Sequence, residues 1–257
     1  MLERLDYVKL SPSRILDAGS GPSPQAGSLA QRYPGAQLVA LDVSLEMLKA
    51  ISPPRFVDRL RGRKRPMRIC ADMGRLPLES RSVSLVWSNM ALHSSVDAPT
   101  TLAEYNRVLE VEGLIMFSTL GPDTLKELRS AFAGFSQAAH VHSFIDMHDI
   151  GDMLVAAGFA APVMDTETIT LTYADFAGMT ADLKSTGQVC ALTGRSRGLS
   201  GPRMWKTVAE SLGRFARDGR IPATVEVVYG HAWKAAPRKT PEGDAIVNFR
   251  SDSRLRN

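Results

Sequence analysis

The sequence predicts an α/β fold with a mostly parallel seven-stranded sheet, an antiparallel last strand and a small helical lobe. In the first half of the chain, short apolar segments alternate with segments of helical periodicity, which is typical of a parallel sheet covered by helices on both faces. In the second half, two late strand-like segments enclose further helical segments. This second pattern indicates that the last strand of the sheet is antiparallel and that helices are inserted between the last two strands.

The first half supplies five predicted strands and three predicted helices. The strands are expected at 13–17, 37–42, 67–71, 83–89 and 113–119. The helices are expected at 25–33, 44–51 and 100–109. Ser44 has the side chain of an N-cap residue. Leu102, Tyr105 and Val108 recur at the spacing of one helix face.

The second half begins with a helix near Asp123 and a second helix over 149–157, which Gly158 ends as a C-terminal cap. Later elements are a strand over 163–173, helices over 175–185 and 202–217 separated by the glycine-rich segment 193–201, and a final strand over 224–233. We therefore expect a single domain over 1–235. We also expect a helical insertion at about 174–221 and a polar C-terminal tail over 236–257.

Composition indicates a globular protein, because 44% of the 257 residues are hydrophobic and 23% are charged. No apolar run approaches the roughly 20 residues of a membrane span, and residues 1–6 are too polar for a signal peptide. Cys70 and Cys190 lie far apart and give no disulfide framework. We expect a cytoplasmic protein with reduced thiols and no membrane partner, in which Cys70 is a small buried side chain.

The net charge of +4 comes from two basic stretches. One lies within 55–68 and the other within 195–220. Each is open to two interpretations, a solvated surface or a docking face for an acidic partner. Nucleic acid is disfavoured because neither stretch contains a known nucleic-acid module.

The segment 15–21 is the most informative part of the sequence, because an apolar strand runs into a turn containing Gly19 and Gly21. Asp42 ends the next predicted strand, 21 residues after Gly21, which is the distance that a strand–helix–strand nucleoside site requires. Asp17 stands inside the turn. A carboxylate there would repel a pyrophosphate and suit an amino-acid ammonium group, so the pattern favours S-adenosylmethionine over NAD.

Four predicted strand ends together form the candidate cofactor site, since open α/β sheets bind ligands at the carboxyl ends of their strands. The residues are Asp17, Gly19, Ser20, Gly21, Asp42, Val43, Asp72, Met73, Ser88 and Asn89. The first turn would hold the methionyl part, Asp42 the ribose and Asp72 the adenine, while Ser88 and Asn89 would complete the wall. Taken singly, a glycine turn can be purely structural and a strand-end Asp can be a helix cap.

These motifs resemble the class I S-adenosylmethionine-dependent methyltransferases over about residues 13–120. The resemblance implies a Rossmann-like methyltransferase domain. One departure is that Ser23 stands where the family's first motif usually has its third glycine. Relatives also carry a helical segment before the first strand that folds over the cofactor as a lid. Because this chain begins about a dozen residues before that strand, we expect the lid to be missing and catalytic competence to be in question.

A narrower resemblance, to the malonyl-[acyl-carrier protein] O-methyltransferases of biotin synthesis, covers nearly the whole chain. The segments that carry it are 72–78, 86–92, 117–129, 144–152, 183–187 and 229–233. A mitochondrial complex I assembly factor resembles the chain in the same architecture and in many of these sequence segments. That factor is associated with arginine hydroxylation.

The narrower resemblance implies methyl transfer to the free carboxylate of a malonyl thioester on acyl carrier protein. Two alternatives stay open: a relative with another acceptor, such as a protein-arginine-modifying factor, or a non-catalytic cofactor-binding scaffold. The candidate substrate residues are Arg129 as the carboxylate-orienting cation, His93 as a pocket residue and Tyr229 on the last strand. No catalytic base is assigned, and we expect no metal at the cluster of histidines and aspartates within 140–149 because no metal-ligand spacing is present.

Overall fold

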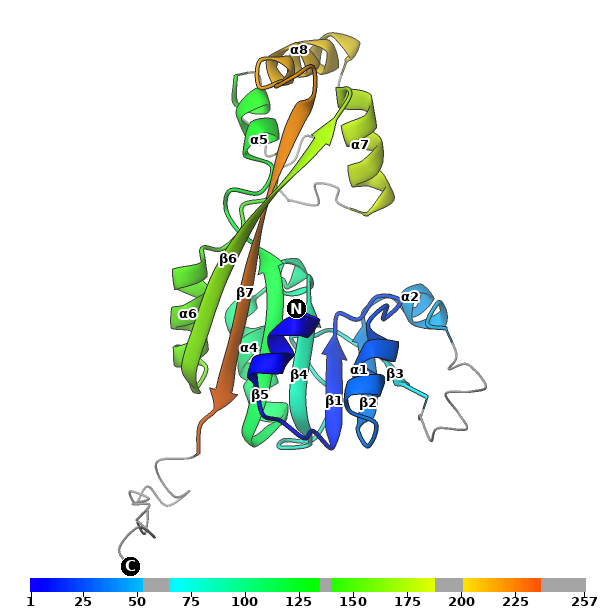
Figure 1. Ribbon diagram of the computed structural model, residues 1–257, viewed down its shortest axis with the longest axis vertical. Helices are drawn as coiled ribbons and strands as arrows, with labels where there is room; N and C mark the ends of the chain where they lie inside the picture. Colours follow the sequence, from blue (N-terminus) through cyan, green and yellow to red (C-terminus); the bar gives the residue numbers. More distant parts are fainter. Residues whose placement is uncertain (53–64, 135–139, 188–200, 237–257) are drawn as a thin grey trace, which may run out of the picture.

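The structure, a computed structural model, describes residues 1–52, 65–134, 140–187 and 201–236. The described residues form one seven-stranded sheet in the order β3-β2-β1-β4-β5-β7-β6 (Figure 1). The strands are β1 Arg14–Ala18, β2 Gln37–Asp42, β3 Met67–Cys70, β4 Val83–Asn89, β5 Leu109–Leu120, β6 Phe159–Tyr173 and β7 Ile221–Lys234. Only β7 runs antiparallel to its neighbours. The predicted fold class is therefore confirmed.

Helices cover both faces of the sheet, and each face has its own apolar core. The α-helices are α1 Ala26–Arg32, α2 Leu45–Lys49, α4 Ala98–Val108, α5 Lys126–Ala133, α6 Met147–Ala156, α7 Phe176–Ser185 and α8 Pro202–Gly213. Two 3-10 helices are η1 Leu2–Tyr7 and η2 Leu92–Ser94. Side chains of α4 and α6 pack in one core, and Leu5 of η1 and Leu29 of α1 pack in the other. Figure 1 shows η1 and α1 on the near face of the sheet.

The parallel strands bring four loops to one end of the sheet. Leu16 of β1 is in register with Val39 of β2 and Val86 of β4, and all three side chains are buried at the centre of the sheet. Because β1 to β5 all run in one direction, the residues that follow each strand meet at a common edge. That edge faces the lobe in Figure 1.

The lobe is built from α5, α7 and α8 at the far ends of β6 and β7 (Figure 1). It has a separate apolar core that includes Phe132, Met179, Val208 and Leu212. The two long strands pair from Phe159–Lys234 at one end to Tyr173–Ile221 at the other, and so connect the sheet to the lobe. The α7 and α8 helices lie between β6 and β7 in the chain. The division into one domain with a helical insertion and a tail stays a prediction.

Several local expectations were wrong. Cys70 is exposed, not buried, because β3 is the edge strand of the sheet, and its Sγ donates to the carbonyl oxygen of Val43 at 3.4 Å. The β6 strand begins at Phe159 and not at residue 163. A bulge between Ala160 and Val163, with Ala161 at φ +49°, lets the pairing of β6 with β7 continue on both sides of Pro162. The α8 helix ends at Gly213 and not at residue 217. The short η1 helix was not predicted.

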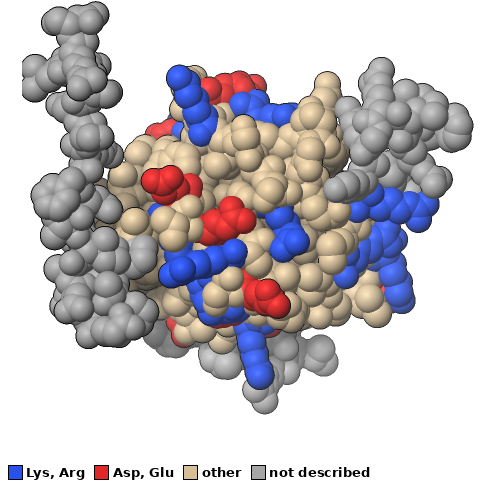
Figure 2. Space-filling view, turned by 90° about the horizontal axis from the view of Figure 1, so that it is seen from below, with Lys and Arg blue, Asp and Glu red and all other residues tan. Residues whose placement is uncertain are grey.

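Exposed basic side chains lie on α8 and in the residues that follow it, within the second of the two basic stretches. They are Arg203, Lys206, Arg214, Arg217 and Arg220. Most of the first stretch, together with 193–200 and 237–257, lies outside the described residues. On the end of the molecule seen in Figure 2, acidic and basic side chains are mixed across the middle of the face. Among the described residues, no helix has both the length and the apolar character to cross a membrane.

Candidate functional site

The turn after β1 is held against the end of β2. The amides of Gly19 and Ser20 both donate to the carbonyl oxygen of Leu41 at 2.9 Å. Gly19 has a φ of +69°, and a Cβ at this position would lie 2.3 Å from the Cβ of Ala91. Glycine is therefore required here by the left-handed backbone and by the close approach of Ala91, which follows β4.

Asp17 is 3% exposed, and its Oδ2 accepts a hydrogen bond from the Ser23 hydroxyl at 2.5 Å. Ser23 has a φ of +48°, so the serine adopts the backbone conformation that favours glycine. Burial, together with the Asp42 carboxylate, raises the pKa of Asp17 to about 6 against the opposing effect of the Ser23 hydrogen bond. Since Asp17 forms no ion pair among the described residues, a cationic ligand would relieve this unfavourable burial of charge.

Asp42 is fixed by two backbone amides at the end of β2. Its Oδ2 accepts from the Gly21 amide at 2.8 Å and its Oδ1 from the Ser44 amide at 2.8 Å. Each carboxylate oxygen can accept more than one hydrogen bond, so the group can still accept from ligand hydroxyls. The neighbouring Val43 is 74% exposed and offers an apolar surface beside it. A Cβ on Gly21 would meet nothing within 4 Å, which indicates open space next to this carboxylate.

Asp72 follows β3 and is exposed, and its Oδ1 accepts from the Gly74 amide at 2.6 Å. Next to it, Met73 accepts a hydrogen bond on its sulfur from the Tyr105 hydroxyl at 3.4 Å. Tyr105 is fully buried on α4. The helical periodicity predicted only that Tyr105 packs on the buried face of its helix. The contact of its hydroxyl with Met73 was not predicted from the sequence.

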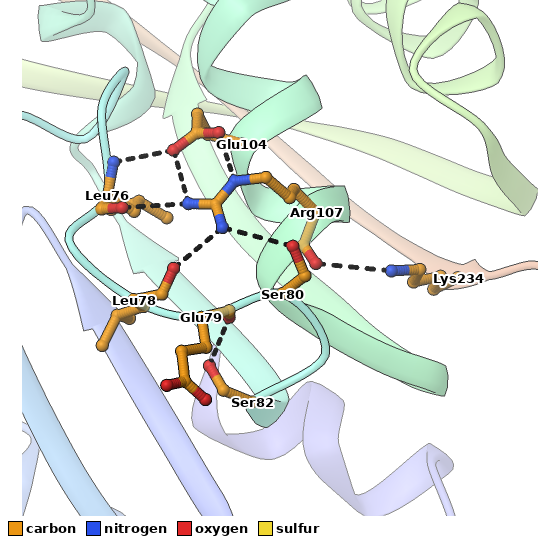
Figure 3. A network of polar contacts seen from close by, with 8 residues as sticks. All are labelled: Leu76, Leu78, Glu79, Ser80, Ser82, Glu104, Arg107 and Lys234. Carbon is orange, nitrogen blue, oxygen red and sulfur yellow. Dashed lines mark hydrogen bonds and ion pairs between the residues drawn. The ribbon is translucent and has the colours of Figure 1, made fainter.

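Arg107 of α4 anchors the loop that carries Asp72 (Figure 3). Its guanidinium donates to the carbonyl oxygens of Leu76 at 2.9 Å and Leu78 at 2.8 Å. Glu104 accepts from the Arg107 Nε at 2.6 Å and from the Leu76 amide at 2.8 Å. The loop between β3 and β4 is thereby fixed to a helix that is itself packed in the core.

Ser88 and Asn89 end β4. Asn89 accepts from the Ser118 hydroxyl at 2.7 Å through its Oδ1, which ties the ends of β4 and β5 together. Ser88 is completely buried. Its hydroxyl lies near that of Tyr105, yet within the described part of the chain no partner meets it with hydrogen-bond geometry.

Three carboxylates converge at this edge of the sheet. Asp42 raises the pKa of Asp17, and burial raises the pKa of Tyr105 with smaller contributions from Asp17 and Asp72 in the same direction. A cluster of this kind generates a negative potential that attracts a cation. With open space beside Gly21 and the apolar Val43, the arrangement fits a cationic nucleoside such as S-adenosylmethionine. The role of each residue in binding stays a prediction.

His93 lies on η2, just beyond the cofactor candidates. Burial lowers the pKa of His93 to about 4, and His142 contributes in the same direction, so the imidazole is neutral near pH 7. Its Nδ1 is buried and has no hydrogen-bond partner among the described residues. The ring meets that of Phe144 edge-on, with 5.9 Å between the ring centroids.

Arg129 and Tyr229 lie in different surroundings. The Arg129 guanidinium donates to the carbonyl oxygens of Pro122 at 2.9 Å, Thr124 at 3.1 Å and His142 at 3.2 Å, so it joins α5 to the segment beside His93. Tyr229 lies on β7. The Arg4 guanidinium carbon lies 4.1 Å from the centre of the Tyr229 ring, and Arg4 also pairs with Asp165 at 2.5 Å.

Within the described ranges, no three histidine, cysteine or carboxylate side chains are grouped in a way that could hold a metal ion. His140 stacks on Phe132 of the lobe instead, with 4.1 Å between the ring centroids.

Comparisons with known proteins agree with this geometry. Residues 16–117 match the family model described as a methyltransferase domain. The fold resembles that of the Bacillus subtilis protein YcgJ with a TM-score of 0.63 at 14% identity, over 92% of this chain and 97% of that one. The fold and the site thus define a Rossmann-like class I methyltransferase.

Two curated relatives show to which family of methyltransferases the chain belongs. A malonyl-[acyl-carrier protein] O-methyltransferase of Gallionella capsiferriformans is 52% identical over 96% of this chain and 86% of the relative. The protein of the same name from Laribacter hongkongensis is 50% identical over 97% of this chain and 86% of the relative. The chain belongs to the malonyl-[acyl-carrier protein] O-methyltransferase family.

Proposed function

We propose that this chain transfers a methyl group from S-adenosylmethionine to the free carboxylate of a malonyl thioester on acyl carrier protein, a step in biotin-precursor synthesis. The observation that carries the proposal is the convergence of Asp17, Asp42 and Asp72 at one edge of the sheet. Membership of the family supports the same acceptor.

The cofactor supplies an electrophilic methyl group when it is bound. Asp17 would hold the ammonium of its amino-acid part, because a buried carboxylate without a cation gains from an incoming positive charge. Asp42 would accept from the ribose hydroxyls and Asp72 from the adenine amine. Val43 would lie against the base as an apolar surface.

No general base is needed for this reaction, because a carboxylate acceptor is already ionised near neutral pH. The work of the chain is to hold the acceptor in line with the methyl group and to exclude water. Positioning of this kind lowers an activation barrier by roughly 7–11 kcal/mol. His93, which is neutral near pH 7, has no base role to play in such a step.

The protein partner would be acidic, as acyl carrier proteins are. Exposed basic side chains on and after α8 offer complementary charge on the lobe, which lies on the side of the sheet toward which the carboxyl ends of the parallel strands point (Figure 1). Masking the malonyl charge as an ester would let the acyl chain enter elongation, which is the purpose of the reaction in this family.

The test is incubation of the purified chain with malonyl-acyl carrier protein and S-adenosylmethionine, read by intact mass. We expect the addition of one methyl group to the malonyl form and none to the acetyl form, which has no free carboxylate. Methylation of another acceptor alone would contradict the proposal. Complementation of a biotin auxotroph that lacks this step tests the same proposal in cells.

Calorimetry with S-adenosylmethionine and its demethylated product separates an enzyme from a scaffold. Binding of the cofactor together with methyl transfer supports the proposal. Absence of heat with both ligands, and of any transfer, would instead favour a non-catalytic scaffold.

A further inference from the structure

A cavity of about 140 Å³ lies directly beyond the ends of β4 and β5. Its lining combines apolar and polar residues. The apolar ones include Leu92 of η2, Leu120 of β5, and Phe144 and Ile145 of the segment before α6, and the polar ones are His93, Ser95, Thr119 and Ser143. The imidazole of His93 is its largest polar group. The cavity is separate from the three-carboxylate edge, and the cofactor candidates do not line it.

The cavity lies close to two of the cofactor candidates. Leu92 and His93 follow Ala91, which lies against Gly19 in the turn after β1. Leu120 lies two residues after Ser118, whose hydroxyl donates to Asn89 at 2.7 Å. The segments at the ends of β4 and β5 that line this cavity are therefore continuous with residues that contact the cofactor candidates.

The chemistry of the lining restricts what can enter. None of the described residues that line it is charged at neutral pH, because the only titratable one is His93 and burial keeps it neutral. The buried Nδ1 of His93 has no partner in the described chain, and an unpaired buried polar atom is unfavourable. A short ligand that carries an oxygen for a hydrogen bond to His93 fits these walls.

Arg129 stabilises one wall of the cavity. Its hydrogen bonds to Pro122, Thr124 and His142 hold the segment that continues into Ser143, Phe144 and Ile145. The cavity is therefore built from three fixed parts, namely the end of β5, the η2 helix and this anchored segment. A fixed cavity of limited size can select its ligand by length.

We propose that this cavity binds the acyl group of the acceptor, that His93 hydrogen-bonds an acyl oxygen there, and that the cavity wall restricts the acceptor to a short dicarboxylic chain. The proposal rests on the proposed function and adds the acceptor subsite to it.

The first test replaces His93 with Leu, and with Gln as the conservative variant that retains hydrogen-bonding atoms. We expect His93→Leu to lower kcat/KM for malonyl-acyl carrier protein by about 10–100-fold, as for the loss of a hydrogen bond in a substrate site. His93→Gln should recover most of it, and the Kd for the cofactor should stay unchanged. The matched control is His148→Leu on the exposed face of α6, which should behave like wild type.

The second test enlarges the cavity with Ile145→Ala, since Ile145 is 37% exposed in the native chain and so tolerates truncation without loss of the core. We expect the ratio of kcat/KM for succinyl- over malonyl-acyl carrier protein to rise by about 10-fold or more, the usual discrimination for one methylene group. This readout does not depend on whether the His93 variants fold.

The outcomes are distinguishable. An unchanged chain-length preference in Ile145→Ala, with active wild type, would overturn the cavity assignment and leave the proposed function intact. Wild-type acceptor kinetics in His93→Leu would overturn the cavity assignment in the same way. A wild-type chain that binds cofactor but methylates neither acceptor would overturn the proposed function itself.

Discussion

The two halves of the strand edge differ in how their polar groups are paired. At the ends of β1 and β2, Asp17 and Asp42 are held by Ser23, Gly21 and Ser44, all within the same stretch of sequence. Beyond the end of β4, at the cavity proposed for the acceptor, the His93 Nδ1 is buried without a hydrogen-bond partner among the described residues.

The ends of β1 and β2, which we call the cofactor half, therefore have their carboxylates hydrogen-bonded before any ligand binds. The cavity at His93, which we call the acceptor half, contains a buried nitrogen that only a ligand could hydrogen-bond. Variants in the first half should therefore change cofactor binding, and variants in the second half should change acceptor kinetics. Five sets of variants and conditions test that separation, beginning with the largest expected effect.

Gly19→Ala should have the largest effect. A Cβ there would lie 2.3 Å from the Cβ of Ala91 and would also occupy a left-handed backbone, which alone costs about 1–2 kcal/mol. We expect no measurable cofactor binding by calorimetry and a clearly lower melting temperature. Gly21→Ala is the matched control, because it has a similar φ of +53° but open space around its Cβ. An equal loss in both variants would contradict the role of the Ala91 contact.

Asp17→Asn should weaken cofactor binding by about 10–100-fold, since it removes a charge-assisted hydrogen bond worth about 1.5–3 kcal/mol. Acceptor KM at saturating cofactor should change little. The measurement is calorimetric titration with S-adenosylmethionine at pH 8, where the native carboxyl is ionised. An unchanged Kd would remove Asp17 from the site.

The raised pKa of Asp17 means that the stability of the cofactor-free chain should depend on pH. Its folded pKa of about 6 lies above the ordinary value of 3.8, so the folded state holds the proton more tightly. Stability is therefore lost as pH rises between these values, by about 3 kcal/mol when complete. Chemical unfolding from pH 4 to 8 should show this loss in wild type and a smaller one in Asp17→Asn. Identical profiles would contradict it.

Arg129→Leu should raise the acceptor KM by about 10-fold while the cofactor Kd stays within twofold, because three carbonyl contacts that hold the acceptor side are lost. Lys126→Leu, at an exposed position on the same helix, is the control. Steady-state kinetics with each substrate varied in turn measure the effect. A rise in cofactor Kd instead would break the proposed separation of the two halves.

Ser23 should show the smallest effect. Ser23→Ala loses the hydrogen bond to Asp17 and keeps the strained backbone, so about 1 kcal/mol of stability should be lost. Ser23→Gly loses the same bond but relieves the left-handed strain, and should be the more stable of the two. In both variants the pH midpoint of cofactor binding should move upward, because this bond lowers the pKa of Asp17. A downward movement would contradict the assignment.

The cofactor half could be predicted from sequence because its contacts are local. Asp17, the glycines and Asp42 belong to one strand–helix–strand unit, in which the spacing fixes the geometry. Ser23 was recognised as a departure, but its left-handed backbone and bond to Asp17 were visible only in the structure.

Contacts between distant segments could be predicted only in part. On the cofactor side, Tyr105 reaches Met73 across 32 positions of sequence. On the acceptor side, the cavity at His93 needs the segment at Phe144 to close it. Helical periodicity placed Tyr105 in the core without showing what its hydroxyl meets. The exposure of Cys70 depended on strand order, which an apolar pattern does not determine.

The paired β6 and β7 strands have a mechanical consequence. Their ladder is continuous from the sheet to the lobe, with one shift of register between Ala160 and Val163. The lobe is therefore joined to the sheet by a continuous hydrogen-bonded ladder of two long strands, so a change in the direction of either strand would also change the position of the lobe.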